Sequence, residues 1–189
     1  MKNLKDLILD NQRVLLRADL NAPLKADNNG QMQITDDGRL RASVSTIAEL
    51  IHRGCKIVIL AHLGRPKGER KPELSLRPIC KRLSELLNKD IKFIDQIDDK
   101  TKDLVNGLKS GEVAMIENIR FEKDETSKDQ SERIRLAQKL AALADFFVID
   151  GFGVVHREQA SVTDVARLLP RAAGKLVEAE QKAFDKVLN

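Results

Sequence analysis

The chain has 189 residues and a formal net charge of +4, from 33 lysines and arginines against 29 aspartates and glutamates. This length suits one domain with a sizeable core, and the absence of Trp and Tyr, with only six Phe, leaves few side chains on which nucleic-acid bases could stack. Because no apolar run approaches the ~20 residues of a membrane span and the N-terminus has no signal-peptide core, we expect a cytoplasmic protein without nucleic-acid or membrane partners.

Five short apolar segments are typical of strands that are buried on both faces. In chain order they are residues 13–20, 56–61, 91–94, 113–117 and 145–150. Between them, apolar residues recur at intervals of three and four, which predicts helices. These helical patterns cover residues 40–51, 76–87 and 134–144. The alternation predicts an α/β fold, a three-layer αβα Rossmann-like domain with a parallel sheet.

Three other segments complete the predicted domain. Residues 122–135 are dense in charges of both signs, which predicts a solvent-exposed loop that enters the third helix. Cys55 and Cys80 have no Cys-X-X-Cys pairing, so we expect both to be reduced and to lie in or near the core. The apolar residues from Leu176 to Leu188 predict one amphipathic helix that leaves the domain.

Polar side chains gather where the predicted strands end, which is where ligands bind in an open parallel sheet. They are Asp19, Asn21, His62, Arg65, Glu117, Asn118, Arg120, His156 and Arg157, together with Arg39 at the start of the first helix. An arginine fork binds phosphate or carboxylate with two hydrogen bonds, and Asp19 and Asn21 suit hydroxyl groups. The pattern predicts a small hydroxylated ligand with more than one negative group.

Structural roles explain some of the same residues. A single arginine after a strand is commonly an ion-pair partner, and Gly64, Pro66 and Gly68 are also accounted for by a turn. His62 and His156 suit hydrogen-bond donation or a structural role better than proton transfer. Four arginines at neighbouring strand ends nevertheless favour an anion site.

Five motifs carry a resemblance to a known family. RADLNAP, DDGRLRA, AHLGRPKG, ENIRFEKDE and DGFGVVHREQAS, in this order, resemble the amino-terminal half of phosphoglycerate kinases, from about Leu4 to the closing helix. The resemblance implies a kinase of two Rossmann-like domains, of which the amino-terminal one binds 3-phosphoglycerate and the other binds Mg-ATP or Mg-ADP. It implies substrate contacts from Asp19, Asn21, Arg39, His62, Arg65, Arg120 and Arg157, with Arg39 catalytic and Arg17, Leu63, Gly64 and His156 in support.

The sequence also departs from the family pattern. Gly151 and the pair Val154 and Val155 stand where many members have other residues, which leaves the fine shape of that loop open. No GxxxxGK[ST] nucleotide loop is present. We therefore expect a substrate domain over residues 1–172, the start of an interdomain helix over residues 173–189, and no cofactor or metal site in this chain, the nucleotide domain being absent.

These features define the expected function. The resemblance implies reversible phosphoryl transfer between 1,3-bisphosphoglycerate with ADP and 3-phosphoglycerate with ATP, a step of glycolysis, by an enzyme that is monomeric at full length. This chain alone is expected to bind substrate without turnover. A non-catalytic anion-binding module is the alternative, and a nucleic-acid-binding protein, supported only by the basic rim, is a third reading.

Overall fold

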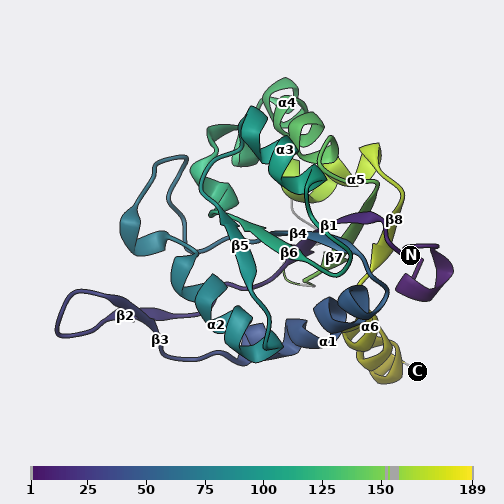
Figure 1. Ribbon diagram of the computed structural model, residues 1–189, viewed down its shortest axis with the longest axis horizontal. Helices are drawn as coiled ribbons and strands as arrows, with labels where there is room; N and C mark the ends of the chain where they lie inside the picture. Colours follow the sequence, from purple (N-terminus) through teal and green to yellow (C-terminus); the bar gives the residue numbers. More distant parts are fainter. Residues whose placement is uncertain (1, 152, 154–157, 189) are drawn as a thin grey trace.

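A six-stranded parallel sheet forms the centre of the computed structural model, which describes residues 2–151, 153 and 158–188 (Figure 1). Its strands are β1 (Arg13–Ala18), β4 (Lys56–Leu60), β5 (Ile91–Ile94), β6 (Val113–Ile116), β7 (Phe146–Asp150) and β8 (Arg171–Ala173), in the order β5-β6-β4-β1-β7-β8. Every neighbouring pair in this sheet is parallel. The five predicted strands and the parallel α/β fold are confirmed, and β8 is an additional edge strand.

Helices cover both faces of the sheet (Figure 1). They are α1 (Gly38–His52), α2 (Arg77–Leu87), α3 (Asp99–Asn106), α4 (Gln130–Ala141), α5 (Val165–Leu168) and α6 (Lys175–Leu188). Helices α1, α2 and α6 lie on one side, whereas α3, α4 and α5 lie on the other. The three predicted layers are therefore present.

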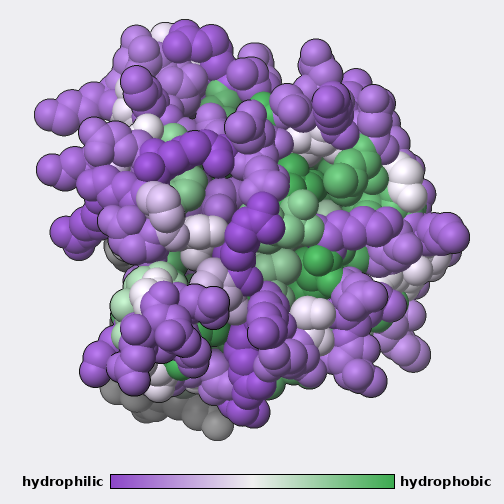
Figure 2. All heavy atoms as spheres, turned by 60° about the vertical axis from the view of Figure 1, so that its left-hand side comes forward, coloured by the Kyte–Doolittle hydropathy of each residue, from purple (hydrophilic) through white to green (hydrophobic). Residues whose placement is uncertain are grey.

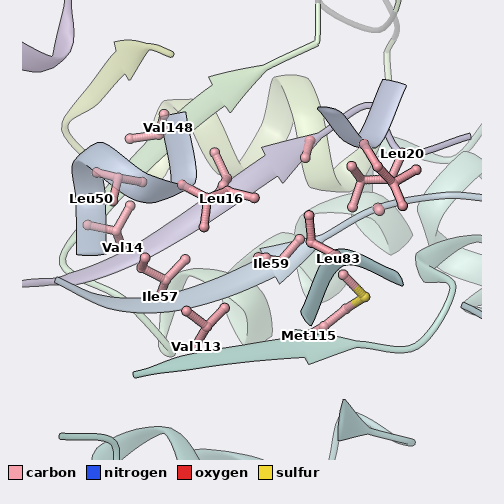
Figure 3. Packing of buried hydrophobic residues seen from close by; sticks show 14 of the residues in the cluster. Val14, Leu16, Leu20, Leu50, Ile57, Ile59, Leu83, Val113, Met115 and Val148 are labelled. Carbon is pink, nitrogen blue, oxygen red and sulfur yellow. The ribbon is translucent and has the colours of Figure 1, made fainter. Parts of the chain in front are cut away.

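Alternating strand side chains divide the core between these two faces. In β4, Ile57 and Ile59 join the cluster under α1 and α2, and Val58 and Leu60 join the cluster under α3, α4 and α5. This follows from the period of two along a strand. Figure 3 shows the first cluster, with Val14, Leu16, Ile57, Ile59, Val113, Met115 and Val148 from the sheet and Leu50 and Leu83 from the helices.

Short elements connect the larger ones. They are the antiparallel hairpin of β2 (Leu24–Ala26) and β3 (Met32–Ile34), the 3₁₀ helices η1 (Leu4–Asp6), η2 (Pro72–Leu74), η3 (Ile119–Phe121) and η4 (Lys123–Thr126), and the π-helical turn η6 (Ala160–Asp164). The hairpin projects from the side of the sheet near α2 (Figure 1). None of the helices in the described part of the chain is both long and apolar enough to cross a bilayer.

The prediction that residues 122–135 are solvent-exposed is wrong for two side chains. Glu125 is fully buried, and Arg133 is 8% exposed. Both charges have partners: Glu125 accepts two hydrogen bonds from Ser161, and Arg133 donates from Nε to Asp164 over 2.9 Å. The pairing offsets the cost of removing each charge from water, which the charge density of the segment alone could not reveal.

The other segment predictions are largely confirmed. Cys55 and Cys80 are free and buried, and burial raises the pKa of each thiol to about 11. The closing residues form the predicted helix, α6, but the prediction that it leaves the domain is wrong for its first turn, because Val177 is only 3% exposed and α6 packs against α1 and β7. Strand β8 ends at Ala173 and therefore crosses the expected domain boundary between residues 172 and 173. The division of the chain at this boundary stays a prediction.

Candidate functional site

The candidate site lies where the central strands of the sheet end. Asp19 and Asn21 follow β1, residues 61–68 follow β4, and Arg120 follows β6 in η3. Because β6, β4 and β1 are consecutive neighbours in the sheet, their carboxyl ends are adjacent. His156 and Arg157, which follow β7 in the sequence, lie outside the described residues.

Arg39 and Asp19 are joined at this edge. Arg39 stands in the first turn of α1 and donates from Nη1 to Oδ2 of Asp19. The arginine side chain is 54% exposed, whereas the aspartate side chain is 12% exposed. The Asn21 N–H donates to Oδ1 of the same carboxylate over 3.4 Å. Asp19 therefore orients the arginine that is expected to be catalytic.

The loop after β4 is tied to both of its neighbours through Gly64. Its N–H donates to Oδ1 of Asn21 over 3.0 Å, and its carbonyl accepts from Nη1 of Arg120 over 2.6 Å. Gly64 has φ of +59°, and a Cβ there would lie 2.8 Å from Cδ2 of Leu74. A glycine is favoured because this backbone conformation is strained for residues with a Cβ, and a Cβ would also displace the end of the Leu74 side chain.

Asn118 and Glu117 hold this loop in place. Asn118 accepts from the Leu63 N–H over 3.2 Å and donates to the Leu63 carbonyl over 2.8 Å. Glu117 accepts at Oε1 from the N–H groups of Leu76 and Asn118, and at Oε2 from the Ser75 hydroxyl, each over 2.7 Å. Both side chains are buried. Their roles are structural, although their position at a strand end suggested the site.

Arg17 and His62 form a buried pair beside these loops. Arg17 is fully buried, His62 is 4% exposed, and Nη2 of Arg17 lies 3.1 Å from Nδ1 of His62. Arg17 also donates from Nε to the Ser161 hydroxyl over 3.0 Å. Ser161 in turn donates from its hydroxyl to Glu125 over 2.6 Å and from its N–H over 2.9 Å.

Ser161 and Glu125 were not among the predicted site residues. Burial raises the pKa of Glu125, and the positive charge of Arg17 acts in the opposite direction. Glu125 is the last residue of the motif ENIRFEKDE, and Ser161 is the last residue of the motif DGFGVVHREQAS. Their place within these motifs was the sequence signal that could have identified them. They were missed because neither residue follows the end of a strand.

Together these contacts place most of the predicted residues near one another. Asp19, Asn21, Arg39, Gly64 and Arg120 are linked by the bonds given above, and His62 is linked to Arg17. Arg65 is exposed on the same loop as His62 and Gly64. Figure 2, which brings the hairpin side of Figure 1 forward, shows hydrophilic residues over most of this face and an apolar area to the right of its centre.

A cleft opens between these loops and the β2–β3 hairpin. It has a volume of about 470 Å³ and is lined by Asn21, Arg39, Leu63 and Gly64 together with residues of the hairpin and η2. A larger cleft, of about 900 Å³, lies between the hairpin and α2 and contains none of the predicted site residues. The chemistry of the linings, rather than their volume, therefore assigns the smaller cleft to the site.

Metal ligands are not gathered in the described part of the chain. Among residues 2–151, 153 and 158–188, no group of three or more His, Cys, Asp or Glu side chains could hold a metal ion. The sequence also has no glycine-rich loop with a following lysine of the GxxxxGK[ST] type. The arginine donors at this edge are of the kind that bind a small anion.

Known proteins resemble this chain over nearly its whole length. A family model described as phosphoglycerate kinase matches residues 4–189. A protein named phosphoglycerate kinase from Frankia alni is 50% identical over 186 residues, which cover 95% of this chain and 46% of that protein. The protein of the same name from Bifidobacterium longum is 50% identical over 188 residues, covering 98% of this chain and 46% of that protein.

Solved structures show the same likeness. The crystal structure of phosphoglycerate kinase from Pyrococcus horikoshii has a TM-score of 0.86 and 36% identity, with 97% of this chain and 44% of that chain covered. The structure from Coxiella burnetii has a TM-score of 0.80 and 34% identity, with the same coverage of 97% and 44%. This chain spans about half the length of the curated relatives that it matches.

Proposed function

The chain belongs to the phosphoglycerate kinase family, and from this we propose that it forms the 3-phosphoglycerate-binding half of a two-domain enzyme. The observation that carries the proposal is the linked set of Asp19, Asn21, Arg39, Gly64 and Arg120 at one edge of the sheet. Arginine forks suit the phosphate and carboxylate of such a substrate, and the amide of Asn21 suits its hydroxyl. The substrate class therefore matches the chemistry of the edge.

The proposed reaction needs charge stabilisation more than proton transfer. The acceptor is a carboxylate, which with a pKa of about 3.5 to 4 is ionised at neutral pH, so no general base is required. The obstacle is repulsion between this anion and the transferring phosphoryl group, which preorganised cations reduce. In this proposal Arg39 contacts the transferring group, and Arg65, Arg120 and Arg157 hold the substrate.

The Mg-nucleotide is proposed to bind in a second domain. The described residues provide no cluster of metal ligands, and the sequence provides no phosphate-cradling loop, so the donors present here do not fit that group. Phosphoryl transfer requires donor and acceptor to be held in line. We therefore propose that this chain alone binds 3-phosphoglycerate without turnover, and that the full-length enzyme acts as a monomer in the cytoplasm.

Calorimetric titration of the chain tests the binding half of the proposal. We expect 3-phosphoglycerate to bind and Mg-ATP to give no saturable heat. Arg65→Ala should weaken 3-phosphoglycerate binding by about tenfold, because a hydrogen bond to a charged group contributes about 1.5 kcal/mol. Saturable binding of Mg-ATP with no response to 3-phosphoglycerate would contradict the proposal.

Arg41→Ala is the matched control for this titration. Arg41 lies two residues after Arg39, about 200° around the helix axis, and its Nε donates to Asp37 over 2.8 Å. The variant removes the same charge as Arg65→Ala, but from an exposed arginine on the side of α1 that faces away from Arg39. Its affinity for 3-phosphoglycerate should stay within about twofold of wild type, so a larger loss would indicate a response to total charge.

A further inference from the structure

Four buried polar side chains form a continuous line of hydrogen bonds that ends at His62. The line runs from Glu125 through Ser161 and Arg17 to the imidazole. Glu125, Ser161 and Arg17 are each fully buried, and His62 is 4% exposed. Polar groups at such depth are held in one arrangement, because no water is available to replace a hydrogen bond that breaks.

The chemistry of each group fixes the direction of every bond. The Ser161 hydroxyl has one hydrogen, which it donates to Oε1 of Glu125 over 2.6 Å, so the same oxygen accepts from Nε of Arg17 over 3.0 Å. A guanidinium can only donate. Nδ1 of His62, at 3.1 Å from Nη2 of Arg17, is therefore the acceptor, and a neutral imidazole then carries its proton on Nε2.

The π-helical turn η6 presents Ser161 in this position. The N–H groups of Val162, Thr163 and Asp164 all converge on the Gln159 carbonyl, at 3.1, 2.9 and 3.4 Å. The Ser161 N–H instead donates to Oε2 of Glu125 over 2.9 Å. Both carboxylate oxygens of Glu125 thus accept from one serine, which fixes the hydroxyl rotor as well as the carboxylate.

Charge balance favours the same arrangement. The guanidinium of Arg17 is buried, and the carboxylate of Glu125, one hydroxyl group away, supplies a compensating negative charge. A buried cation without such a partner would be costly and would have no fixed orientation. The hydroxyl group of Ser161 bridges these two charges.

We propose that Ser161 and Glu125 are positioning residues for His62, which hold Arg17 against Nδ1 so that His62 offers a proton on Nε2 to an anionic group of the substrate. An N–H donor attracts a phosphate or carboxylate oxygen, whereas a ring lone pair would repel it. The substrate part of this inference rests on the proposed function. The hydrogen-bond part concerns the chain alone.

Nitrogen NMR of the ¹⁵N-labelled chain without ligand tests the hydrogen-bond part. In spectra recorded at a pH of about 8, we expect His62 to show a protonated Nε2 and a bare Nδ1, whereas exposed His52 should report a mixture of the two tautomers. The Arg17 Nε–H should exchange slowly with water. A protonated Nδ1 on His62 would overturn the inference.

Ser161→Ala removes the bridge and should make the Arg17 Nε–H exchange at least tenfold faster and mix the His62 tautomers. Glu125→Gln, which keeps the shape of the side chain, should act in the same direction and serves if the first variant folds poorly. Ser127→Ala is the matched control, because Ser127 also donates to a glutamate, Glu132, over 2.6 Å. Unchanged His62 and Arg17 signals in both Ser161→Ala and Glu125→Gln would overturn the inference.

Binding of 3-phosphoglycerate tests the substrate part separately. We expect Ser161→Ala to raise the dissociation constant by about tenfold, Ser127→Ala to leave it within twofold, and Ser161→Thr, which keeps the hydroxyl, to recover most of the loss. Wild-type affinity in Ser161→Ala, despite altered NMR signals, would overturn the link to substrate. If the wild-type chain itself failed to bind 3-phosphoglycerate, the proposed function would fail, and the NMR result would still decide the hydrogen-bond line.

Discussion

Nη1 of Arg39 donates a hydrogen bond to Oδ2 of Asp19, and the exposed fractions of the two side chains are 54% and 12%. The mostly buried carboxylate therefore fixes an arginine that reaches into solvent. A guanidinium has five N–H donors, so one bond to Asp19 sets its direction and leaves donors for an anion.

Replacement of Arg39 should slow the chemical step of the whole enzyme. When this chain is joined to a nucleotide-binding domain of its family, we expect Arg39→Ala to lower kcat by about 10³-fold, because the arginine contacts a group that carries charge in the transition state. Steady-state kinetics with 3-phosphoglycerate and Mg-ATP measure this effect. Arg41→Ala provides the control, and a kcat for Arg39→Ala within about threefold of wild type would refute the catalytic role.

Glu117 should contribute strongly to stability although it lies at the edge of the site. Glu117→Ala leaves the buried N–H groups of Leu76 and Asn118 without their acceptor, and each such loss costs about 1 to 3 kcal/mol. We expect the free energy of unfolding in urea to fall by about 3 kcal/mol. The exposed ion pair of Glu85 with Arg82 supplies a control, since Glu85→Ala should change the same quantity by less than about 1 kcal/mol. Equal losses in the two variants would argue against the assigned role.

Gly174 packs so closely against Asp150 that a methyl group has no room. A Cβ at Gly174 would lie 2.5 Å from Cγ and 2.7 Å from Cβ of Asp150. We expect Gly174→Ala to lower the free energy of unfolding by about 3 kcal/mol, because overpacking in a filled region typically costs that much. Gly107→Ala is the comparison, since its Cβ would make ordinary contacts at 3.4 Å or more and its φ of −78° suits alanine. Urea unfolding of both variants gives the answer, and similar stability would contradict the packing argument.

Asp150 and Asp145 should affect the pH dependence of stability with opposite signs. Burial raises the pKa of Asp150 above its ordinary value of 3.8, whereas the hydrogen bond from Arg13 lowers the pKa of Asp145 below it. The folded protein therefore holds a proton on Asp150 after the unfolded chain has released it, and this contribution to stability disappears as pH rises through the folded pKa. The contribution of Asp145 to stability is fully present at pH values above its ordinary pKa of 3.8, and it disappears as pH falls through its lower folded pKa.

Two asparagine variants separate these contributions. Relative to Asp150→Asn, wild type should lose stability as pH rises from about 4 to 7, and relative to Asp145→Asn it should lose stability as pH falls from about 5 to 3. Asparagine at position 150 can still accept from the Leu176 N–H, which Asp150 binds over 2.9 Å. Urea unfolding at a series of pH values measures both differences, and a shared sign would show that one of the two environments is misassigned.

Long apolar patterns made most of the fold predictable from the sequence. β4, with the sequence KIVIL, is buried over four of its five residues, and its period and turn residues are unambiguous. Helix α3 was not predicted, because only Leu104 and Val105 are apolar in DKTKDLVN, and its start depends on the capping box of Asp98 and Thr101. β8 has only three residues and exists through its pairing with β7, which composition does not encode.

The candidate site was predictable where residues follow strands and not where loops bring distant residues together. Asp19, Asn21 and Arg120 stand directly after strands, so the edge rule located them. Ser161 contacts Glu125, 36 residues earlier, and Arg17, 144 residues earlier in the chain. No local periodicity reports such separations. The charge of Glu125 argued for exposure, whereas its burial depends on the two hydrogen bonds from Ser161 and on the nearby cation of Arg17.

The position of β1 in the sheet has a consequence for synthesis of the chain. β1 pairs with β4 on one side and with β7 on the other, and Arg13 at its start is 132 residues from Asp145, which binds it beside β7. Because the ribosome adds about 5 to 20 residues per second, the side of β1 that pairs with β7 stays unpaired for on the order of ten seconds during synthesis. We expect this unpaired flank, with Leu15 and Leu16 beside it, to be where a nascent chain is most prone to chaperone capture or to association with another nascent chain.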